Sequence, residues 1–306
     1  MNNIDTPLRP HYTISSLAVL LQAECIANHS ANMAASIDLL LTDSRSVAIG
    51  ERTVFFALVT AQGSGHSYIE QLYQKGVRCF VVERLNEGWT QLEAAVFLRV
   101  PNTLQALQYL AERHRQCIAH PVIGITGSNG KTTVKEWLYQ LMMGWRGVVR
   151  SPRSYNSQIG VPLSVWLLGT PAEIGIIEAG ISQIGEMATL APIVAPTIGV
   201  LTNISDAHQE HFDSLEQKCL EKLQLFESAN VLIYNADDSL ISSCISKSNL
   251  RAKLLGWSLT DSHALLWIRT CRPLDAHTTF IAYSYLGFEG EFVLPFTDEA
   301  AIQNAL

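Results

Sequence analysis

The sequence predicts an α/β protein with two parts: a small N-terminal α/β domain over residues 1–118 and a P-loop, doubly wound central domain over residues 119–306. Short apolar runs rich in β-branched residues alternate with stretches of helical periodicity along the chain. One run, residues 122–125, leads through a glycine-containing loop into a helical pattern, and later runs end in acidic or amide residues. Such alternation is typical of a mostly parallel sheet with helices on both faces.

Composition excludes several functional classes. With 48% hydrophobic residues, the 306-residue chain can form sizeable cores, and its formal charge of −7 argues against a general electrostatic grip on nucleic acid. The six cysteines form no C-x-x-C pair, which suits a reducing compartment. The N-terminus has no apolar signal core, and no apolar run reaches 18 residues. We therefore expect a cytoplasmic protein without membrane insertion.

In the first domain, Thr13 is expected to cap a helix with an apolar face. Further elements are predicted as strands at 37–41, 54–58, 79–82 and 95–100 and a helix at 102–116. Two loops at expected strand ends could contact a ligand: one carries Ser44 and Arg45, and the other, rich in glycine, carries His66. Such groups can hold a phosphate or a uracil edge. A capped turn is the simpler explanation of each loop, so the residues alone do not decide.

A phosphate-binding loop is the strongest local signal. Gly127 and Gly130 allow the backbone to approach an anion closely, at the positive end of the helix that follows. Lys131 adds a full charge, and Thr132 offers a hydroxyl suited to Mg²⁺. Ile125 stands where the usual pattern has its first glycine, and an incidental glycine turn is the alternative. The predicted nucleotide-binding residues are Gly127, Ser128, Asn129, Gly130, Lys131, Thr132 and Thr133.

Polar residues after two later strands suggest a metal site beside this loop. A strand at 173–177 delivers Glu178 to its carboxyl end, and a strand at 197–201 precedes a loop with Asp206, His208 and His211. Ligands bind at that edge of an open α/β sheet. A carboxylate and an imidazole there could bind Mg²⁺. Surface histidines without a metal are the alternative.

Basic residues outside the phosphate loop admit two explanations each. The segment 144–157 carries Arg146, Arg150 and Arg153, which form either an anion clamp or a solvated loop. Lys218 and Lys222 lie on a helix predicted at 215–227, where lysines are ordinarily solvated. Residues 252–294 suggest short strands with a hairpin at 285–294. A final helix begins near residue 297 and reaches the C-terminus without a stop signal, which suggests a truncated chain.

Seven segments together resemble the Mur ligase family of peptidoglycan (cell wall) synthesis. They are TDSR, FFAL with GSGH, GITGSNGKTTVKE, NSQIGVPL, EAGISQIGE, TNISDAHQEHFDSLEQKCLEKLQLF and NADD, and they cover nearly the whole chain. The loop also fits the family's spacing T-G-x-x-G-K-[ST] from Thr126 to Thr132. Within the family, GKTTVKE resembles the ligases that add D-alanyl-D-alanine to UDP-N-acetylmuramoyl-tripeptide. Gly185-Glu186 differs from the serine-rich stretch of the ligase acting one step earlier.

The resemblance implies ATP-dependent amide formation through an acyl phosphate, with Lys131, the loop amides and Mg²⁺ neutralising charge on the γ-phosphate. It assigns Thr132 and Glu178 to one Mg²⁺ and His208 and Glu178 to a second, and it assigns Lys222 as a lysine that becomes a carbamate ligand. Lys131, Lys222 and His208 would be catalytic. The implied substrate-binding residues are Ser44, Arg45 and His66 for the UDP-sugar, and Asn156 and Ser157 near the muramoyl group.

Departures from the family pattern qualify these assignments. Ser64, Ser157 and the pair Asp298-Glu299 replace residues common in the family. The C-terminal Rossmann-like domain that closes over ATP in the family is expected to be absent from these 306 residues, so we expect weak activity or none from them alone. The region around Asp298 resembles ligases fused to a downstream alanine racemase. Another Mur ligase of the tripeptide synthetase type, or a non-catalytic nucleotide-binding scaffold, are the alternatives.

Overall fold

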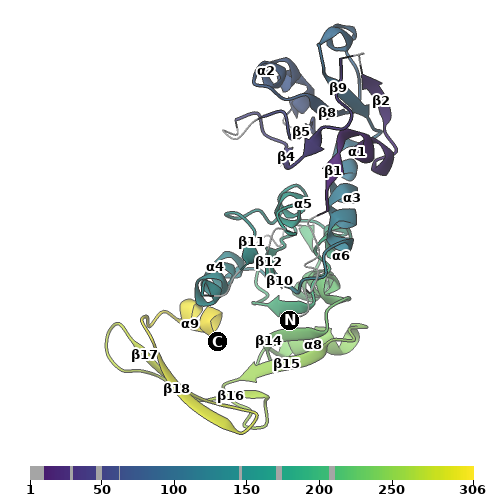
Figure 1. Ribbon diagram of the computed structural model, residues 1–306. Helices are drawn as coiled ribbons and strands as arrows, with labels where there is room; N and C mark the ends of the chain where they lie inside the picture. Colours follow the sequence, from purple (N-terminus) through teal and green to yellow (C-terminus); the bar gives the residue numbers. More distant parts are fainter. Residues whose placement is uncertain are drawn as a thin grey trace, which may run out of the picture. The chain divides into compact units, whose positions relative to one another are not determined.

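The computed structural model describes residues 10–27, 30–45, 50–61, 63–144, 147–169, 174–206 and 211–306 (Figure 1). The chain forms two compact units, Met1–Ile118 and Ala119–Leu306, and each is described by itself. Within the described ranges, no helix is both long and apolar enough to cross a membrane.

The first unit is built on a five-stranded sheet with the order β2-β9-β8-β5-β4, in which only β2 is antiparallel to its neighbour. Its strands are β2 (Glu24–Ala27), β4 (Leu39–Leu41), β5 (Thr53–Phe56), β8 (Cys79–Val82) and β9 (Val96–Arg99). Its helices are α1 (Ile14–Leu20), α2 (Ile69–Gln74) and α3 (Thr103–Gln116), with 3₁₀ helices at Gly65–Tyr68 and Glu87–Gln91. Two short pairs complete it: β1 (Tyr12–Thr13) with β3 (Ser36–Ile37), and β6 (Val59–Thr60) with β7 (Gly63–Ser64).

Aromatic packing and helix caps account for this unit. The rings of Phe80 and Phe97 stack with centroids 5.4 Å apart, and Trp89 stacks on Phe97 at 5.9 Å. Thr13 caps α1 through a capping box, as its sequence position predicts. The predicted strand at 37–41 is wrong as a single element, because the amides of Asp38 and Leu39 both donate to the Arg52 carbonyl and the chain divides into β3 and β4.

The second unit contains a nine-stranded sheet with the order β11-β12-β10-β13-β14-β15-β16-β17-β18. The strands from β11 to β16 are parallel to their neighbours, and β17 and β18 extend the sheet in antiparallel fashion. The strands are β10 (Val122–Thr126), β11 (Val148–Arg150), β12 (Ile174–Glu178), β13 (Ile198–Leu201), β14 (Val231–Asn235), β15 (Lys253–Ser258), β16 (Leu266–Pro273), β17 (Thr279–Tyr285) and β18 (Phe288–Leu294). The helices are α4 (Lys131–Met142), α5 (Gly160–Val165), α6 (Glu186–Val194), α7 (Leu215–Leu223), α8 (Ser239–Lys247) and α9 (Glu299–Ala305), with a 3₁₀ turn at Gln224–Phe226.

Helices cover both faces of this sheet, which confirms the doubly wound prediction (Figure 1). On one face α4 packs on Ile123, Ile125 and Ile176. On the other, glycine allows close packing: a Cβ at Gly199 would lie 2.4 Å from Cδ1 of the fully buried Phe226. The parallel run therefore has the two covered faces that such sheets require.

Two predicted features of this unit are wrong in detail. The segment expected to be a loop, 144–157, contains the edge strand β11, whose short Val-Val-Arg sequence gives no periodic signal. The hairpin expected within 285–294 instead spans β17 and β18. Its turn is the pair Leu286 and Gly287, which have φ values of 50° and 84°. Positive φ at both central residues matches the twist of a two-residue hairpin.

Strand order fixes where the loops meet. The first strand of the unit, β10, lies between β12 and β13, so the loops leaving all three meet at the carboxyl edge of the sheet. In β12, Glu178 is in register with Ile125 of β10, two residues before Gly127. The chain crosses from one side of β10 to the other between β12 and β13, which is the arrangement that opens a ligand crevice.

Candidate active site

The loop after β10 has the backbone geometry of an anion cradle. Gly127 and Gly130 adopt φ values of 148° and 78°. A Cβ at Gly127 would lie 2.0 Å from Oγ1 of Thr202, and one at Gly130 would lie 2.0 Å from Oδ1 of Asn304. The Gly127 position therefore requires glycine for space as well as for conformation, because the backbone carbonyl oxygen of Asn203 would also lie 3.0 Å from that Cβ, and the Gly130 position requires it for its left-handed conformation. Lys131 begins α4, and its Nζ donates to the carbonyl oxygens of Gly127 and Ser128, each at 2.9 Å.

The loop after β13 braces this cradle through a network of hydrogen bonds. The amides of Ser128 and Asn129 donate to the carbonyl and the Oδ1 of Asn203 at 2.8 and 3.0 Å. Thr202 Oγ1 donates to the Asn129 carbonyl at 2.6 Å. Ser205 donates its amide to Ser128 Oγ at 2.9 Å, and its own hydroxyl accepts from Asn129 Nδ2 at 2.9 Å. Side chains and backbone of the two loops thus hold one another in place without any ligand.

A buried carboxylate lies beside the start of α4. Glu178 has no exposed surface, and its two oxygens lie 3.1 and 2.9 Å from Thr132 Oγ1. Asn156 Nδ2 donates to Oε1 at 2.6 Å, and the ammonium group of the fully buried Lys135 lies 3.8 Å from Oε2. The β10–β12 register positions this carboxylate, while the segment after β11 supplies the amide.

The donor set fits Mg²⁺. The Thr132 hydroxyl and Glu178 carboxylate are the oxygen ligands that Mg²⁺ prefers, together with phosphate oxygens and water. Among the described residues, Thr126 Oγ1 is the one buried side-chain N or O atom without a hydrogen-bond partner, and it lies at the end of β10 next to the cradle. The described ranges contain no group of three His, Cys, Asp or Glu residues able to hold a metal.

Three lysines converge on this edge of the sheet. Lys222, on α7, is 2% exposed, and burial, followed by the charges of Lys131 and Lys218, lowers its pKa from 10.5 to about 7. The pKa of Lys131 is lowered by burial and by Lys218, although the Glu178 charge raises it. The expectation that lysines of this helix are ordinarily solvated is wrong for Lys218, which is buried. Lys222, which the family resemblance assigns to the site instead, is buried as well.

The structure brings together part of the predicted set. Thr132 and Asn156 both hydrogen-bond to Glu178. Lys131, the residue before Thr132, hydrogen-bonds instead to the carbonyl oxygens of Gly127 and Ser128. Ser157 is exposed, and its Oγ accepts from the Gly160 amide at 3.2 Å. The predicted ligand His208 lies outside the described residues, as does Arg146.

The two other arginines of the basic segment have different surroundings. Arg150 forms an ion pair with Glu136 at 2.9 Å, and its guanidinium lies 3.7 Å from the ring centroid of Tyr139. Arg153 is exposed and has φ of 48°, with its carbonyl accepting from Lys135. For Arg150 this favours a structural role over an anion clamp.

In the first unit, the predicted ligand residues all follow the carboxyl ends of β4 and β5. Ser44 is nearly buried, with its carbonyl accepting from Lys75 Nζ at 3.1 Å. Arg45 is exposed and pairs with Asp43, and hydrogen bonds from Arg45 lower the pKa of that carboxyl to about 2.

His66 faces a cavity in this unit. Its Nε2 accepts from the Glu83 amide at 3.1 Å, which leaves Nδ1 to donate to Ser64 Oγ at 2.8 Å. Burial, with the charge of Arg84, lowers the pKa of this histidine and favours the neutral ring. Beside it is an open cavity of about 390 Å³ whose lining includes Arg84 and Asn86.

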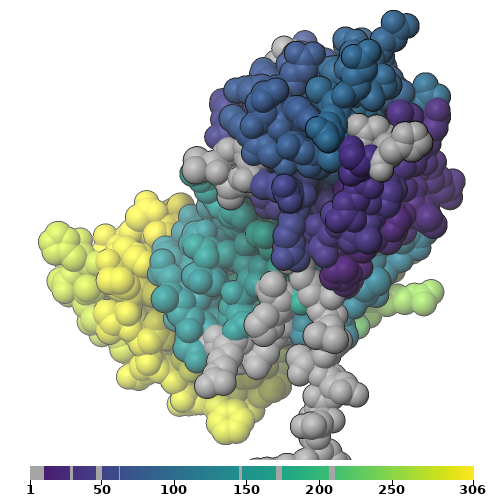
Figure 2. All heavy atoms as spheres, turned by 45° about the horizontal axis from the view of Figure 1, so that its top comes forward, coloured from purple at the N-terminus to yellow at the C-terminus, as the bar shows by residue number. Residues whose placement is uncertain are grey.

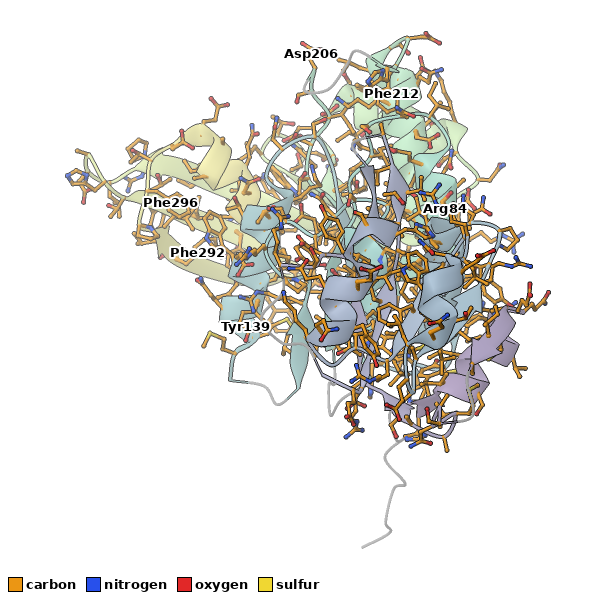
Figure 3. The ribbon with its side chains drawn as sticks, turned by 90° about the horizontal axis from the view of Figure 1, so that it is seen from above. Arg84, Tyr139, Asp206, Phe212, Phe292 and Phe296 are labelled. Carbon is orange, nitrogen blue, oxygen red and sulfur yellow. The ribbon has the colours of Figure 1, made fainter. Side chains whose placement is uncertain are left out.

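An apolar cavity that the sequence did not predict lies in the second unit. It has a volume of about 680 Å³ and lies between α4, the strands β13 to β15, β18 and α9. Trp137 and Phe296 stack beside it with centroids 5.3 Å apart. Figure 2 shows the C-terminal segment against the surface of α4, and Figure 3 shows Phe292 and Phe296 on that segment. Its lining comes from segments far apart in sequence, which explains why no local pattern revealed it.

Comparison with known proteins identifies the family. The chain matches the Mur ligase middle domain over residues 125–306 and the Mur ligase family catalytic domain over residues 36–115. The chain therefore belongs to the Mur ligase family. It is 30% identical over 268 residues to the UDP-N-acetylmuramoyl-tripeptide--D-alanyl-D-alanine ligase of Bacillus subtilis, covering 87% of this chain and 56% of that protein. It is 35% identical over 253 residues to the ligase of the same name from Borreliella burgdorferi, covering 79% and 53%.

These relatives place the chain in the MurF branch of the family. Solved structures agree on the fold: MurF from Acinetobacter baumannii superposes with a TM-score of 0.81 at 23% identity, over 98% of this chain and 64% of that one. MurF from Thermotoga maritima in complex with ADP gives 0.74 at 23% identity, over 87% and 60%. The chain spans about half the length of these two curated relatives.

Sequence reasoning missed two contributors to the site, Lys135 and Asn304, and assigned no role to either residue. Lys135 lies one helical turn after Lys131, on the same face of α4, and that spacing could have placed it near the carboxylate. Asn304 lies beside the cradle only because α9 packs back on α4 after eight intervening strands, and no local signal predicts that contact.

Proposed function

We propose that this chain is the UDP-substrate-binding and ATP-binding part of a ligase that joins D-alanyl-D-alanine to UDP-N-acetylmuramoyl-tripeptide in cytoplasmic peptidoglycan synthesis. The observation that carries this proposal is the cluster at the end of β10, where Lys131, Thr132 and buried Glu178 meet an anion cradle. The B. subtilis and B. burgdorferi relatives carry that ligase name, and the T. maritima structure holds ADP.

The chemistry requires two anions to meet. In the proposed reaction a tripeptide carboxylate oxygen attacks the γ-phosphorus of ATP, ADP leaves, and the resulting acyl phosphate is attacked by the D-alanyl-D-alanine amine with loss of phosphate. Lys131 and the first amide groups of α4 would neutralise the phosphate oxygens. The hydrogen bonds from the Ser128 and Asn129 amides to Asn203 would hold the loop in place for an in-line attack. Preorganised donors of this kind stabilise a developing charge without reorganising.

Glu178 and Thr132 would hold one magnesium ion, with His208 and Glu178 as a proposed second pair. Mg²⁺, when bound, would supply Lewis-acid neutralisation of the transferred phosphoryl group. For the chain itself, Asn156 keeps the carboxylate oriented by donating to Oε1 at 2.6 Å. The depressed pKa of Lys222 leaves a neutral amine available near pH 7, as carbamate formation with CO₂ requires. Lys222 is therefore proposed as the carbamylated lysine.

The UDP-sugar is assigned to the first unit, through Ser44, Arg45 and His66. Its sheet presents these residues after the carboxyl ends of β4 and β5, and the cavity beside His66 offers polar groups from Arg84 and Asn86. Asn156 and Ser157 are proposed for the muramoyl region. A downstream alanine racemase domain stays a prediction of the sequence.

Phosphate release by the intact protein tests the function. We expect release only when ATP, Mg²⁺, UDP-N-acetylmuramoyl-tripeptide and D-alanyl-D-alanine are all present, and a loss of at least a hundredfold in Lys131→Ala. An exposed lysine, Lys247, provides the matched control through Lys247→Ala. Equal rates in wild-type protein and Lys131→Ala, or release independent of D-alanyl-D-alanine, would refute the proposal.

A further inference from the structure

A buried lysine outside the predicted catalytic set connects α7 to the phosphate cradle. Lys218 is 1% exposed, and its Nζ donates to the carbonyl oxygen of Ser205 at 2.7 Å. Ser205 in turn exchanges hydrogen bonds with Ser128, whose amide donates to Asn203. The contact thus runs from α7, through the loop after β13, to the loop after β10.

The surroundings of Lys218 place its charge at this edge of the sheet. The ammonium group lies 6.0 Å from the ring centroid of Phe212, and Asp206 is the charged group that favours its protonated form. Figure 3 shows Asp206 and Phe212 at the same end of the unit. The charge of Lys218 also acts on both Lys131 and Lys222. It is therefore a third cation of the same cluster, one helical turn before Lys222.

A purely structural role explains this lysine poorly. The hydrogen bond to the Ser205 carbonyl requires a donor but not a full charge. Burying an ammonium group costs several kcal/mol even with a carboxylate such as Asp206 acting on it. Glu178 and Glu186 act on Lys131 and Lys222, and Lys218 adds a further positive charge that lowers the pKa of both lysines. A ligand with several negative charges would offset this repulsion among the lysines.

We propose that Lys218 is a positioning residue of the phosphate site, which tethers the loop 202–206 against the cradle and adds a positive charge that favours nucleoside triphosphate. This inference rests on the proposed function for the identity of the ligand. The tether affects the stability of the loop in the ligand-free protein, whereas the charge affects the affinity for bound phosphate. Each effect can therefore be measured separately.

Hydrogen exchange in the ligand-free intact protein tests the tether. We expect Lys218→Met to speed exchange about tenfold or more at the amides of Ser128, Asn129 and Ser205, because the brace on Ser205 is lost. Lys218→Gln keeps a donor for the Ser205 carbonyl and is expected to preserve protection within about threefold. Lys247→Met, on an exposed ion pair, is the control. Unchanged exchange at these amides in Lys218→Met would overturn the tether.

Nucleotide affinity, measured by calorimetry with ATP and AMP, tests the charge. We expect Lys218→Met and Lys218→Gln both to weaken ATP binding about tenfold or more, with a smaller loss for AMP, and Lys218→Arg to restore ATP binding. A general loosening of the fold would weaken both nucleotides equally and would not be rescued by arginine. If Lys218→Gln binds ATP within twofold of the wild-type affinity, the proposal that the Lys218 charge favours ATP is refuted. If the wild-type protein does not bind ATP, the proposed function is contradicted instead. The hydrogen-exchange experiment uses ligand-free protein, so it still tests whether Lys218 tethers the loop 202–206.

Discussion

Replacing Lys222 by methionine is expected to stabilise the protein while abolishing its activity. The pKa of Lys222 is lowered because burial and the charges of Lys131 and Lys218 disfavour the protonated amine in the native state. Between a folded pKa of about 7 and an unfolded value of 10.5, the unfolded chain binds a proton that the native chain releases, so the lysine destabilises the native state and stability rises with pH across that window.

The free-energy cost of burying Lys222 follows from its folded and unfolded pKa values. At pH 7 the unfolded lysine is protonated and the native one about half so, which gives a cost on the order of 4 kcal/mol relative to a side chain that never ionises. At pH 9 the cost falls to roughly 2 kcal/mol, and it approaches zero near the unfolded pKa. Methionine has a similar length and no charge, so Lys222→Met should recover most of this free energy of unfolding at pH 7 and about half as much at pH 9.

Urea denaturation measures the effect, followed by tryptophan fluorescence, since Trp137, Trp145, Trp166, Trp257 and Trp267 all belong to the second unit. Carbon dioxide and nucleotide are excluded, because a carbamate or a bound anion would offset the cost in the wild-type protein. Lys247→Met, at an exposed position, should change stability little at either pH. A Lys222→Met protein no more stable than wild type at pH 7, or one whose gain does not shrink at pH 9, would refute the reasoning.

Three further outcomes follow from the geometry. Gly127→Ala should reduce ATP affinity at least tenfold, measured by calorimetry, because its Cβ would lie 2.0 Å from Thr202 Oγ1; Gly144→Ala, which meets nothing within 4 Å, is the control, and equal affinity in both would count against the cradle. Glu178→Gln should raise the Mg²⁺ concentration needed for half-maximal phosphate release by tenfold or more, whereas an unchanged requirement would remove this residue from the metal site. Phe226→Ala should lower the free energy of unfolding by about 3–5 kcal/mol, because the ring is fully buried against Gly199, and a loss under 1 kcal/mol by urea denaturation would show that the two faces pack more loosely than described.

The features that sequence predicted well are those with local signals. The cradle could be predicted because Gly127, Gly130 and Lys131 are adjacent in sequence and each residue type has a distinct physical role. Strands such as β8 and β10 could be predicted because both faces are covered, which makes the whole run apolar. The edge strand β2 was missed because its side chains are mostly exposed and show no periodicity.

The features that sequence missed depend on tertiary contacts. Lys218 and Lys222 lie four residues apart on α7, a spacing that suits a solvated helical face equally well. Only tertiary packing buries them: α7 lies against α6 and α8, and Lys218 hydrogen-bonds to Ser205 in the loop after β13. The contact between Glu178 and Thr132 similarly requires the register of β10 with β12, which no property of either strand alone specifies.

The imbalance of charge at the end of β10 also bears on which ligand the site was selected for. A chain with a formal charge of −7 has few cations to spare, yet Lys131, Lys218 and Lys222 all converge on one edge of one sheet. As long as Lys222 is not carbamylated, an apolar or neutral ligand would leave the mutual repulsion of these lysines offset only by carboxylates such as Glu178 and Asp206. A triphosphate offsets this repulsion, and its binding would stabilise the native state in proportion to the logarithm of its concentration over its dissociation constant. The lysines therefore make the native state depend on the anion that the proposed reaction consumes.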